Sequence, residues 1–176
     1  MSETKSLIAY YSRAGNNYVG GKIVNIPVGN TEVVAKMIQK LTGSDIFRID
    51  TIKVYPAGYH ETTDVAKQEL RQNARPELSG HVGNMAEYNV IYLGYPNWWG
   101  TMPMAVLTFL EEYDFSGKTM IPFCTHEGSG MGRSESDLRK LCPAARVLPG
   151  LPIVGGSVHG AEVEIANWLK KLHDFL

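Results

Sequence analysis

The sequence has little of what marks highly charged or membrane-spanning proteins. Its formal net charge is -1, and no stretch carries five or more like charges in a row. A nearly neutral chain gives no general electrostatic reason to bind nucleic acid or an acidic lipid surface. Its longest apolar stretches have the length of β-strands, too short to cross a bilayer. We therefore expect a protein that acts without nucleic acid and without a membrane.

Cysteine is also scarce, since Cys124 and Cys142 are the only two. The 17 residues between them fit neither a zinc pattern nor a thioredoxin-like CxxC motif. We expect two reduced thiols that serve as small hydrophobic side chains, and no metal site. The apolar run near the N-terminus is too short and too late for a secretory signal, so we expect a cytoplasmic protein.

Common nucleotide-binding and nucleophile motifs are missing as well. Neither GxxxxGK[ST] nor GxGxxG occurs, although Gly128, Gly130 and Gly132 alternate. Ser129 does not lie in a GxSxG sequence, which argues against a hydrolase nucleophile. The sequence thus gives no sign of a nucleoside triphosphate cradle or of a serine hydrolase.

What the chain does contain is a regular alternation of strand and helix patterns, in a length of 176 residues that fits one domain, 1–176. We expect strands at residues 6–12, 45–50, 87–96, 118–125 and within 145–156. Helices are expected after Asn30 as N-cap, at about 62–73, after Pro103, at 134–142 and at about 160–175. This order predicts an α/β fold, a doubly wound five-stranded parallel sheet, with ligands bound beyond the carboxyl ends of its strands.

The loop after the first expected strand is interrupted. It runs from Ser12 to Asn16 and is completed by Asn30-Thr31 at the start of a helix. Short polar side chains and helix-terminal N–H groups can hold a phosphate without lysine, although an ordinary capped turn would look the same. The residues between, about 17–29, have β-formers on both sides of Gly20-Gly21 and predict an inserted β-hairpin.

Two further loops carry ligand-binding patterns. After the third strand, Trp98 and Trp99 are adjacent, so one ring should face inward and the other the rim of a cleft. An exposed indole can stack on a flat ligand, and a partner interface would use it equally well. After the fourth strand, glycines let backbone amides approach a heterocycle. His126 beside Glu127 could act in acid–base or metal chemistry, or be ordinary polar surface.

Four segments make the chain resemble the flavodoxins, in particular a branch with a double tryptophan. They are "SRAG" with "GNTEVVAK", "VYPAGYHETTDVAKQEL", "GYPNWWGTMP" and "THEGSGMGRS". The resemblance implies a flavodoxin-like sheet of order 2-1-3-4-5 and non-covalent FMN. It places the phosphate and the ring system of FMN among three sets of residues, one from each loop: Ser12, Arg13, Ala14, Asn16, Asn30 and Thr31; Pro96, Asn97, Trp98, Trp99 and Gly100; Thr125, His126, Glu127, Gly128, Ser129 and Gly130.

The resemblance leaves several functions open. The first is a low-potential electron carrier, in which no side chain acts as acid, base or nucleophile and a carbonyl within 97–100 faces flavin N5. Its redox partner would be a protein or a small-molecule oxidant. The second is an NAD(P)H-dependent quinone or flavin reductase. A flavin-storing module is a third, and a phosphate-switched receiver domain fits poorly because the expected acidic residues are missing after strands one and three.

Overall fold

A computed structural model describes residues 4–176, so the expected domain lies within it except for residues 1–3. The main sheet has the order β4-β1-β5-β6-β7, with β8 also paired to β6, and every pairing in it is parallel. This confirms the predicted 2-1-3-4-5 topology, with the fifth position divided into two short strands. The strands are β1 (Ser6–Tyr10), β4 (Asp45–Arg48), β5 (Val90–Pro96), β6 (Thr119–His126), β7 (Arg146–Val147) and β8 (Leu151–Val154).

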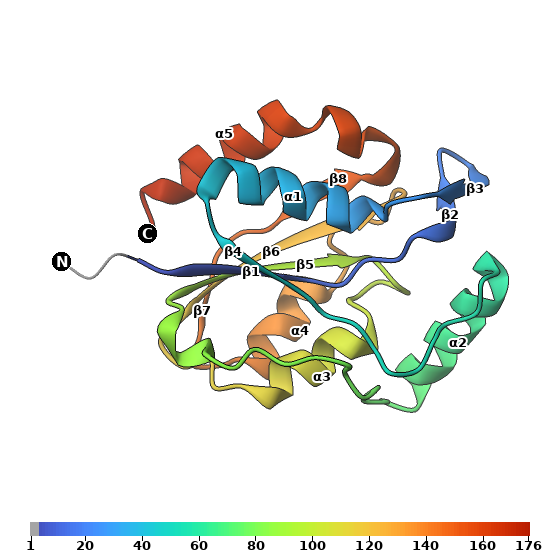
Figure 1. The fold of residues 1–176 in the computed structure, drawn as a ribbon, viewed down its shortest axis with the longest axis horizontal. Coiled ribbons are helices and arrows are strands. Elements are labelled where there is room, and N and C mark those ends of the chain that lie inside the picture. Colours follow the sequence, from blue (N-terminus) through green and yellow to red (C-terminus); the bar gives the residue numbers. More distant parts are fainter. Residues whose placement is uncertain (1–3) are drawn as a thin grey trace.

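Helices cover both faces of this sheet (Figure 1). Helices α1 (Asn30–Thr42) and α5 (Glu162–His173) lie on one face, and α3 (Met104–Glu112) and α4 (Ser134–Leu141) lie on the other. Helix α2 (Tyr59–Arg71) lies beyond the carboxyl ends of the strands. Two short 3-10 helices complete the fold, η1 (Met85–Glu87) and η2 (Gly155–Gly160).

The central strand β5 explains why helices are needed on both faces. Six of its seven residues, Val90 to Tyr95, are buried, with side chains alternating between two hydrophobic clusters. One cluster lies between the sheet and α1 with α5, and the other lies on the side of α3 and α4. The unbroken apolar run of a doubly covered strand is therefore what made β5 recognisable in the sequence.

Several predicted boundaries need correction. The strands expected at 6–12 and 45–50 end two residues early, at Tyr10 and Arg48, before the loops that follow them. The strand expected at 87–96 begins later, at Val90, because Glu87 still belongs to the 3-10 helix η1 and Tyr88 ends it. Helix α2 begins at Tyr59, earlier than expected. The N-cap of α1 is Gly29, and Asn30 is already helical. Gly43 ends α1 with a φ of 69°, as its sequence position indicated.

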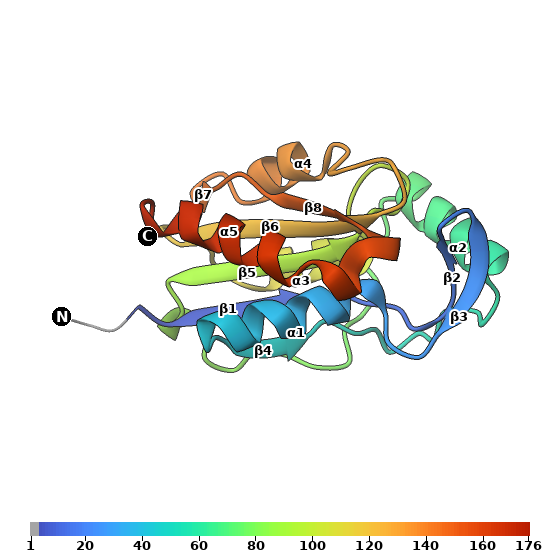
Figure 2. The same ribbon diagram turned by 90° about the horizontal axis from the view of Figure 1, so that it is seen from above.

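The inserted hairpin is present. It consists of β2 (Gly15–Val19) and β3 (Lys22–Ile26), so its strands begin two residues before the predicted 17–29 and end within it. Its turn residues Gly20 and Gly21 have φ values of 61° and 83°, the conformation that a two-residue hairpin loop of this kind requires. The hairpin lies at the carboxyl edge of the sheet, beside α2 (Figure 2).

Both cysteines are free and buried, which confirms their expected role as small hydrophobic residues. Cys124 lies on β6, and Cys142 ends α4. Across residues 4–176, no helix combines the length and the apolar character that a membrane crossing requires.

Candidate functional site

A cavity of about 430 Å³ lies at the carboxyl edge of the sheet, a size typical of small-molecule sites. All three loops singled out in the sequence contribute to its walls, together with β2 and α2. The lining residues are Ser12, Arg13, Asn17, Tyr18, Asn30, Thr31, Tyr59, Thr62, Thr63, Ala66, Pro96, Asn97, Trp98, Trp99, Gly100, Thr125, His126, Glu127, Ser129 and Gly155.

The two halves of the interrupted first loop meet again after the hairpin. A Cβ atom placed on Gly29 would lie 2.1 Å from Ser12 Oγ and 2.8 Å from the Arg13 carbonyl oxygen. The backbone N–H of Glu32 donates a hydrogen bond to Ser12 Oγ at 3.0 Å, so Ser12 caps α1 from the far side of the insertion. The remaining first-turn amides of α1 belong to residues that line the cavity, which favours an anion at this end.

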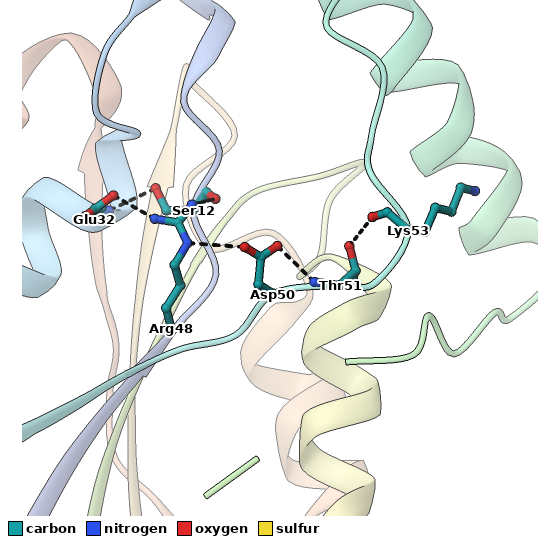
Figure 3. Close-up of polar contacts among 6 residues, drawn as sticks. All are labelled: Ser12, Glu32, Arg48, Asp50, Thr51 and Lys53. Carbon is teal, nitrogen blue, oxygen red and sulfur yellow. Dashed lines mark hydrogen bonds and ion pairs between the residues drawn. The ribbon is translucent and has the colours of Figure 1, made fainter. Parts of the chain in front are cut away.

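A second contact fixes this loop from behind, through Arg48 at the end of β4 (Figure 3). Its guanidinium donates to the carbonyl oxygen of Ser12 at 2.9 Å and to Glu32 Oε2 at 2.8 Å. The third guanidinium nitrogen, Arg48 Nε, lies 3.7 Å from Asp50 Oδ2. Arg48 thus ties the end of β1 to the first turn of α1, and it lies outside the cavity lining.

Buried hydroxyls lie at the floor of the same end. Thr31 and Thr125 are 2% and 5% exposed, and their hydroxyl oxygens are 2.8 Å apart. One of them must be the donor in this pair, which leaves the other hydroxyl proton free to serve a ligand. The first and the third predicted loop are therefore in direct contact.

The guanidinium of Arg13 is already engaged in hydrogen bonds within the protein, so it is not wholly available to bind a phosphate. Its guanidinium donates to the carbonyl oxygens of Pro56 and Ala57 at 3.0 Å each, and to that of Asn16. Burial lowers its pKa, yet an arginine keeps its charge at neutral pH. Arg13 therefore links the first loop, the hairpin and the segment before α2 while it contributes positive charge to the cavity wall.

The two tryptophans separate as expected. Trp98 packs inward, edge-on against Tyr11 at 5.3 Å and Tyr55 at 5.5 Å between ring centroids. Trp99 is 46% exposed; its indole N–H donates to the carbonyl oxygen of Thr63, and Lys67 Nζ lies 5.0 Å from its ring. Both residues line the cavity, so its wall here is aromatic.

The turn that carries these tryptophans is held rigidly. Trp99 and Gly100 have φ values of 56° and 85°. The residues on either side of them, Trp98 and Thr101, exchange two backbone hydrogen bonds, in which the N–H of each donates to the carbonyl oxygen of the other. Positive φ at a bulky residue is strained and persists where neighbours enforce it. Here the N–H of Arg133 donates to the Gly100 carbonyl oxygen at 2.8 Å.

Asn97 joins this turn to the glycine-rich loop. Its side-chain oxygen accepts from the N–H of Gly100 at 2.9 Å, and its side-chain nitrogen donates to the carbonyl oxygen of Gly130 at 2.9 Å. In the glycine-rich loop, the N–H of Gly128 donates to His126 Nδ1 at 2.9 Å. His126 thus shapes the loop. Among residues 4–176, no three His, Cys, Asp or Glu side chains cluster as metal ligands would.

Most of the predicted site residues come together around the cavity. The exceptions are Ala14, Asn16, Gly128 and Gly130, which lie in the same loops but do not line it. The hairpin and α2 contribute lining residues that were not predicted from the sequence: Asn17, Tyr18, Tyr59, Thr62, Thr63 and Ala66, with Gly155 from η2. The α2 residues of this set could have been found, because they lie in segment 54–70, which is one of the four segments that resemble the flavodoxins but was given no role in binding.

Comparison with known proteins supports the resemblance to the flavodoxins. The family model described as flavodoxin matches residues 5–172. A proposed flavoprotein from Bacteroides uniformis has 29% identity and a TM-score of 0.76, covering 95% of this chain and 98% of its own. A Lactobacillus acidophilus flavoprotein in complex with FMN has 19% identity and a TM-score of 0.65, covering 92% and 99%.

A more distant structure, a proposed quinone reductase from Klebsiella pneumoniae, has 13% identity and a TM-score of 0.54, covering 96% of this chain and 85% of its own. At this identity the similarity concerns the fold. No curated protein sequence matches the chain significantly.

Proposed function

The chain belongs to the flavodoxin family, and we propose that it binds FMN non-covalently in the cavity and transfers electrons at low potential. FMN supplies the redox chemistry when bound, and the protein supplies binding, orientation and the surroundings of the ring. The electron partner is a redox protein or a small-molecule oxidant.

One observation carries the proposal: a single cavity joins the first turn of α1 to the wall of Trp98 and Trp99. The α1 end offers hydroxyls, helix-terminal amides and Arg13, which suit a phosphate. The other end offers indole surface, which suits a flat heterocycle. Gly29 leaves room for a close backbone approach, since any side chain there would strike Ser12. A mononucleotide with an aromatic head matches both ends.

The protein residues then have distinct tasks. Ser12, Thr31 and the α1 amides bind the phosphate, while the indoles exclude water from one side of the ring. Asn97 fixes the position of the turn. The carbonyls of Trp98 and Gly100 each accept one backbone hydrogen bond, which leaves those of Asn97 and Trp99 as the freer acceptors for a donor on the ring.

A reductase that uses the same FMN is the second candidate. It is favoured by the extension of the cavity to Tyr18 and Tyr59, whose rings lie stacked with centroids 6.0 Å apart. Aromatic walls at this side give a planar second substrate, such as a nicotinamide or quinone, a surface to lie against.

Stopped-flow mixing of FMN-loaded protein with NADPH or NADH under anaerobic conditions separates the two functions. A carrier leaves the flavin oxidised with either nucleotide and, once reduced by dithionite, passes electrons to a one-electron acceptor such as ferricyanide. Rapid bleaching by a nicotinamide nucleotide, followed by steady turnover when a quinone is added, identifies a reductase. Protein that retains no FMN contradicts both.

A further inference from the structure

The β2–β3 hairpin contributes Asn17 and Tyr18 to the cavity lining and contacts two other lining residues, Tyr59 and Glu127. Within the described chain, β2 and β3 pair only with each other, so the main sheet does not hold the hairpin in place. On one side, the ring of Tyr18 stacks on Tyr59 of α2, with an angle of 29° between their planes. On the other, the N–H of Gly20 donates to Glu127 Oε2 at 3.1 Å.

The Glu127 contact is prepared by the surrounding chain. A Cβ atom on Gly155 would lie 2.4 Å from Glu127 Oε1 and 2.6 Å from Asn30 Nδ2, so a glycine is needed to admit the carboxylate beside α1. The side chain therefore extends from the loop after β6 towards the hairpin turn. Glu127 lines the cavity, as do Tyr18 and Tyr59.

From this geometry, and resting on the proposed function, we propose that the hairpin is a clamp that retains FMN, with Glu127 and Tyr59 as the positioning residues that keep it closed. The hairpin is inserted between the two halves of the phosphate loop, and its residues Asn17 and Tyr18 line the cavity together with Ser12 and Arg13. A ligand anchored there passes the hairpin when it leaves.

Both contacts are weak enough to open. Glu127 and Tyr18 are exposed, with Tyr18 at 42%, so solvent competes for each contact. Where solvent competes, removing a hydrogen bond to a charged group or an aromatic pair changes a rate by roughly tenfold, the lower end for a charged hydrogen bond. The clamp accordingly controls how fast FMN leaves, while the phosphate loop and the tryptophans determine most of the affinity.

The first test measures FMN release by stopped-flow, with excess apoflavodoxin of another source as a trap. Glu127→Ala should release FMN about tenfold faster. Glu127→Gln keeps an acceptor for the Gly20 N–H and should stay within about twofold of the wild type. Glu77→Ala, which removes an exposed carboxylate of the segment before β5, is the matched control and should leave the rate unchanged. Equal rates for Glu127→Ala and the wild type overturn the proposal.

A reversible crosslink tests the clamp within one molecule. A Cβ atom on Gly156 would lie 3.7 Å from Val19 Cγ1, so Val19→Cys with Gly156→Cys can form a disulfide that ties the turn end of the hairpin to η2. The native cysteines are buried and should not interfere. After loading with FMN, oxidation should slow release at least tenfold, and reduction should restore it. Release that ignores the disulfide contradicts the clamp.

Amide hydrogen exchange on the apoprotein gives a readout that needs no flavin. The Gly20 amide should be protected in the wild type and exchange faster in Glu127→Ala, and equal exchange in the two proteins counts against the contact. FMN binding by the wild type separates the two proposals. A wild type that binds no FMN refutes the proposed function, whereas normal binding with unaltered release in every variant refutes only the clamp.

Discussion

Gly29 lies against Ser12 so closely that an added Cβ atom would sit 2.1 Å from the serine hydroxyl oxygen. The contact reunites a loop that a hairpin divides. Gly29→Ala must therefore separate the two halves, at a cost of about 1–3 kcal/mol in unfolding free energy. FMN affinity should fall about tenfold or more.

Urea unfolding and FMN titration measure both effects. Gly80→Ala is the control, because its Cβ would meet only the Phe47 ring at an ordinary 3.8 Å. Wild-type affinity in Gly29→Ala would show that the loop does not depend on this contact.

Arg48 tests the same loop from outside the cavity. Arg48→Met removes the hydrogen bonds to the Ser12 carbonyl and to Glu32, so FMN affinity should fall about three- to tenfold. Stability should change by about 1 kcal/mol or less, because the pair is partly solvated. Arg75→Met, which removes an ion pair to Glu111 away from the cavity lining, should leave the affinity unchanged. Parallel losses in both variants would point to a general effect of removing arginine.

Replacing the two tryptophans should lower the free energy of unfolding by different amounts. Trp98→Ala removes a ring packed against Tyr11 and Tyr55, which should cost about 2–4 kcal/mol in urea unfolding. Trp99→Ala loses an exposed ring and should cost about 1 kcal/mol or less. In FMN-loaded protein, Trp99→Ala should make the two-electron potential less negative, because water reaches the ring. An unchanged potential would remove Trp99 from the flavin surroundings.

The buried thiols predict a loss of stability at alkaline pH. Burial raises the pKa of Cys124 from 9.0 to about 12, so the folded protein keeps a proton that the unfolded chain releases. The unfolded state then binds fewer protons, and stability is complete below about pH 9 and falls as the pH rises towards 12.

Cys124→Ala isolates this contribution, since buried tyrosines act in the same direction in both proteins. Between pH 8 and pH 10, the wild type should lose about 1.4 kcal/mol more unfolding free energy than Cys124→Ala. Equal losses would mean that the thiol ionises in the folded state.

The alternation of strands and helices and the three ligand loops were predictable because they depend on local patterns, whereas the sheet order followed from the family resemblance. The apolar run of β5, the Gly20-Gly21 turn and Gly43 each determine their own segment. Contacts between distant segments were not visible in this way. Ser12 caps α1 across an insertion, and Glu127 reaches Gly20 over a separation of 107 residues. Local sequence periodicity cannot predict either contact, because both join segments that are distant in the sequence.

The cavity wall shows the same division. Trp98 and Trp99 were predicted to face opposite ways as neighbours on an extended chain. They do face opposite ways, but across a turn in which Trp99 has a φ of 56°. Tyr18 and Tyr59 were missed because each alone is an ordinary residue of a hairpin and of a helix start. They become a wall once the fold stacks one ring on the other.

Equilibrium titration of the apoprotein with FMN and with riboflavin, followed by quenching of flavin fluorescence, tests the central claim most directly. We predict one bound FMN per chain and clearly weaker binding of riboflavin, which lacks the phosphate that Ser12, Thr31 and the start of α1 would hold. Absence of FMN binding, or equal affinity for the two flavins, would contradict it.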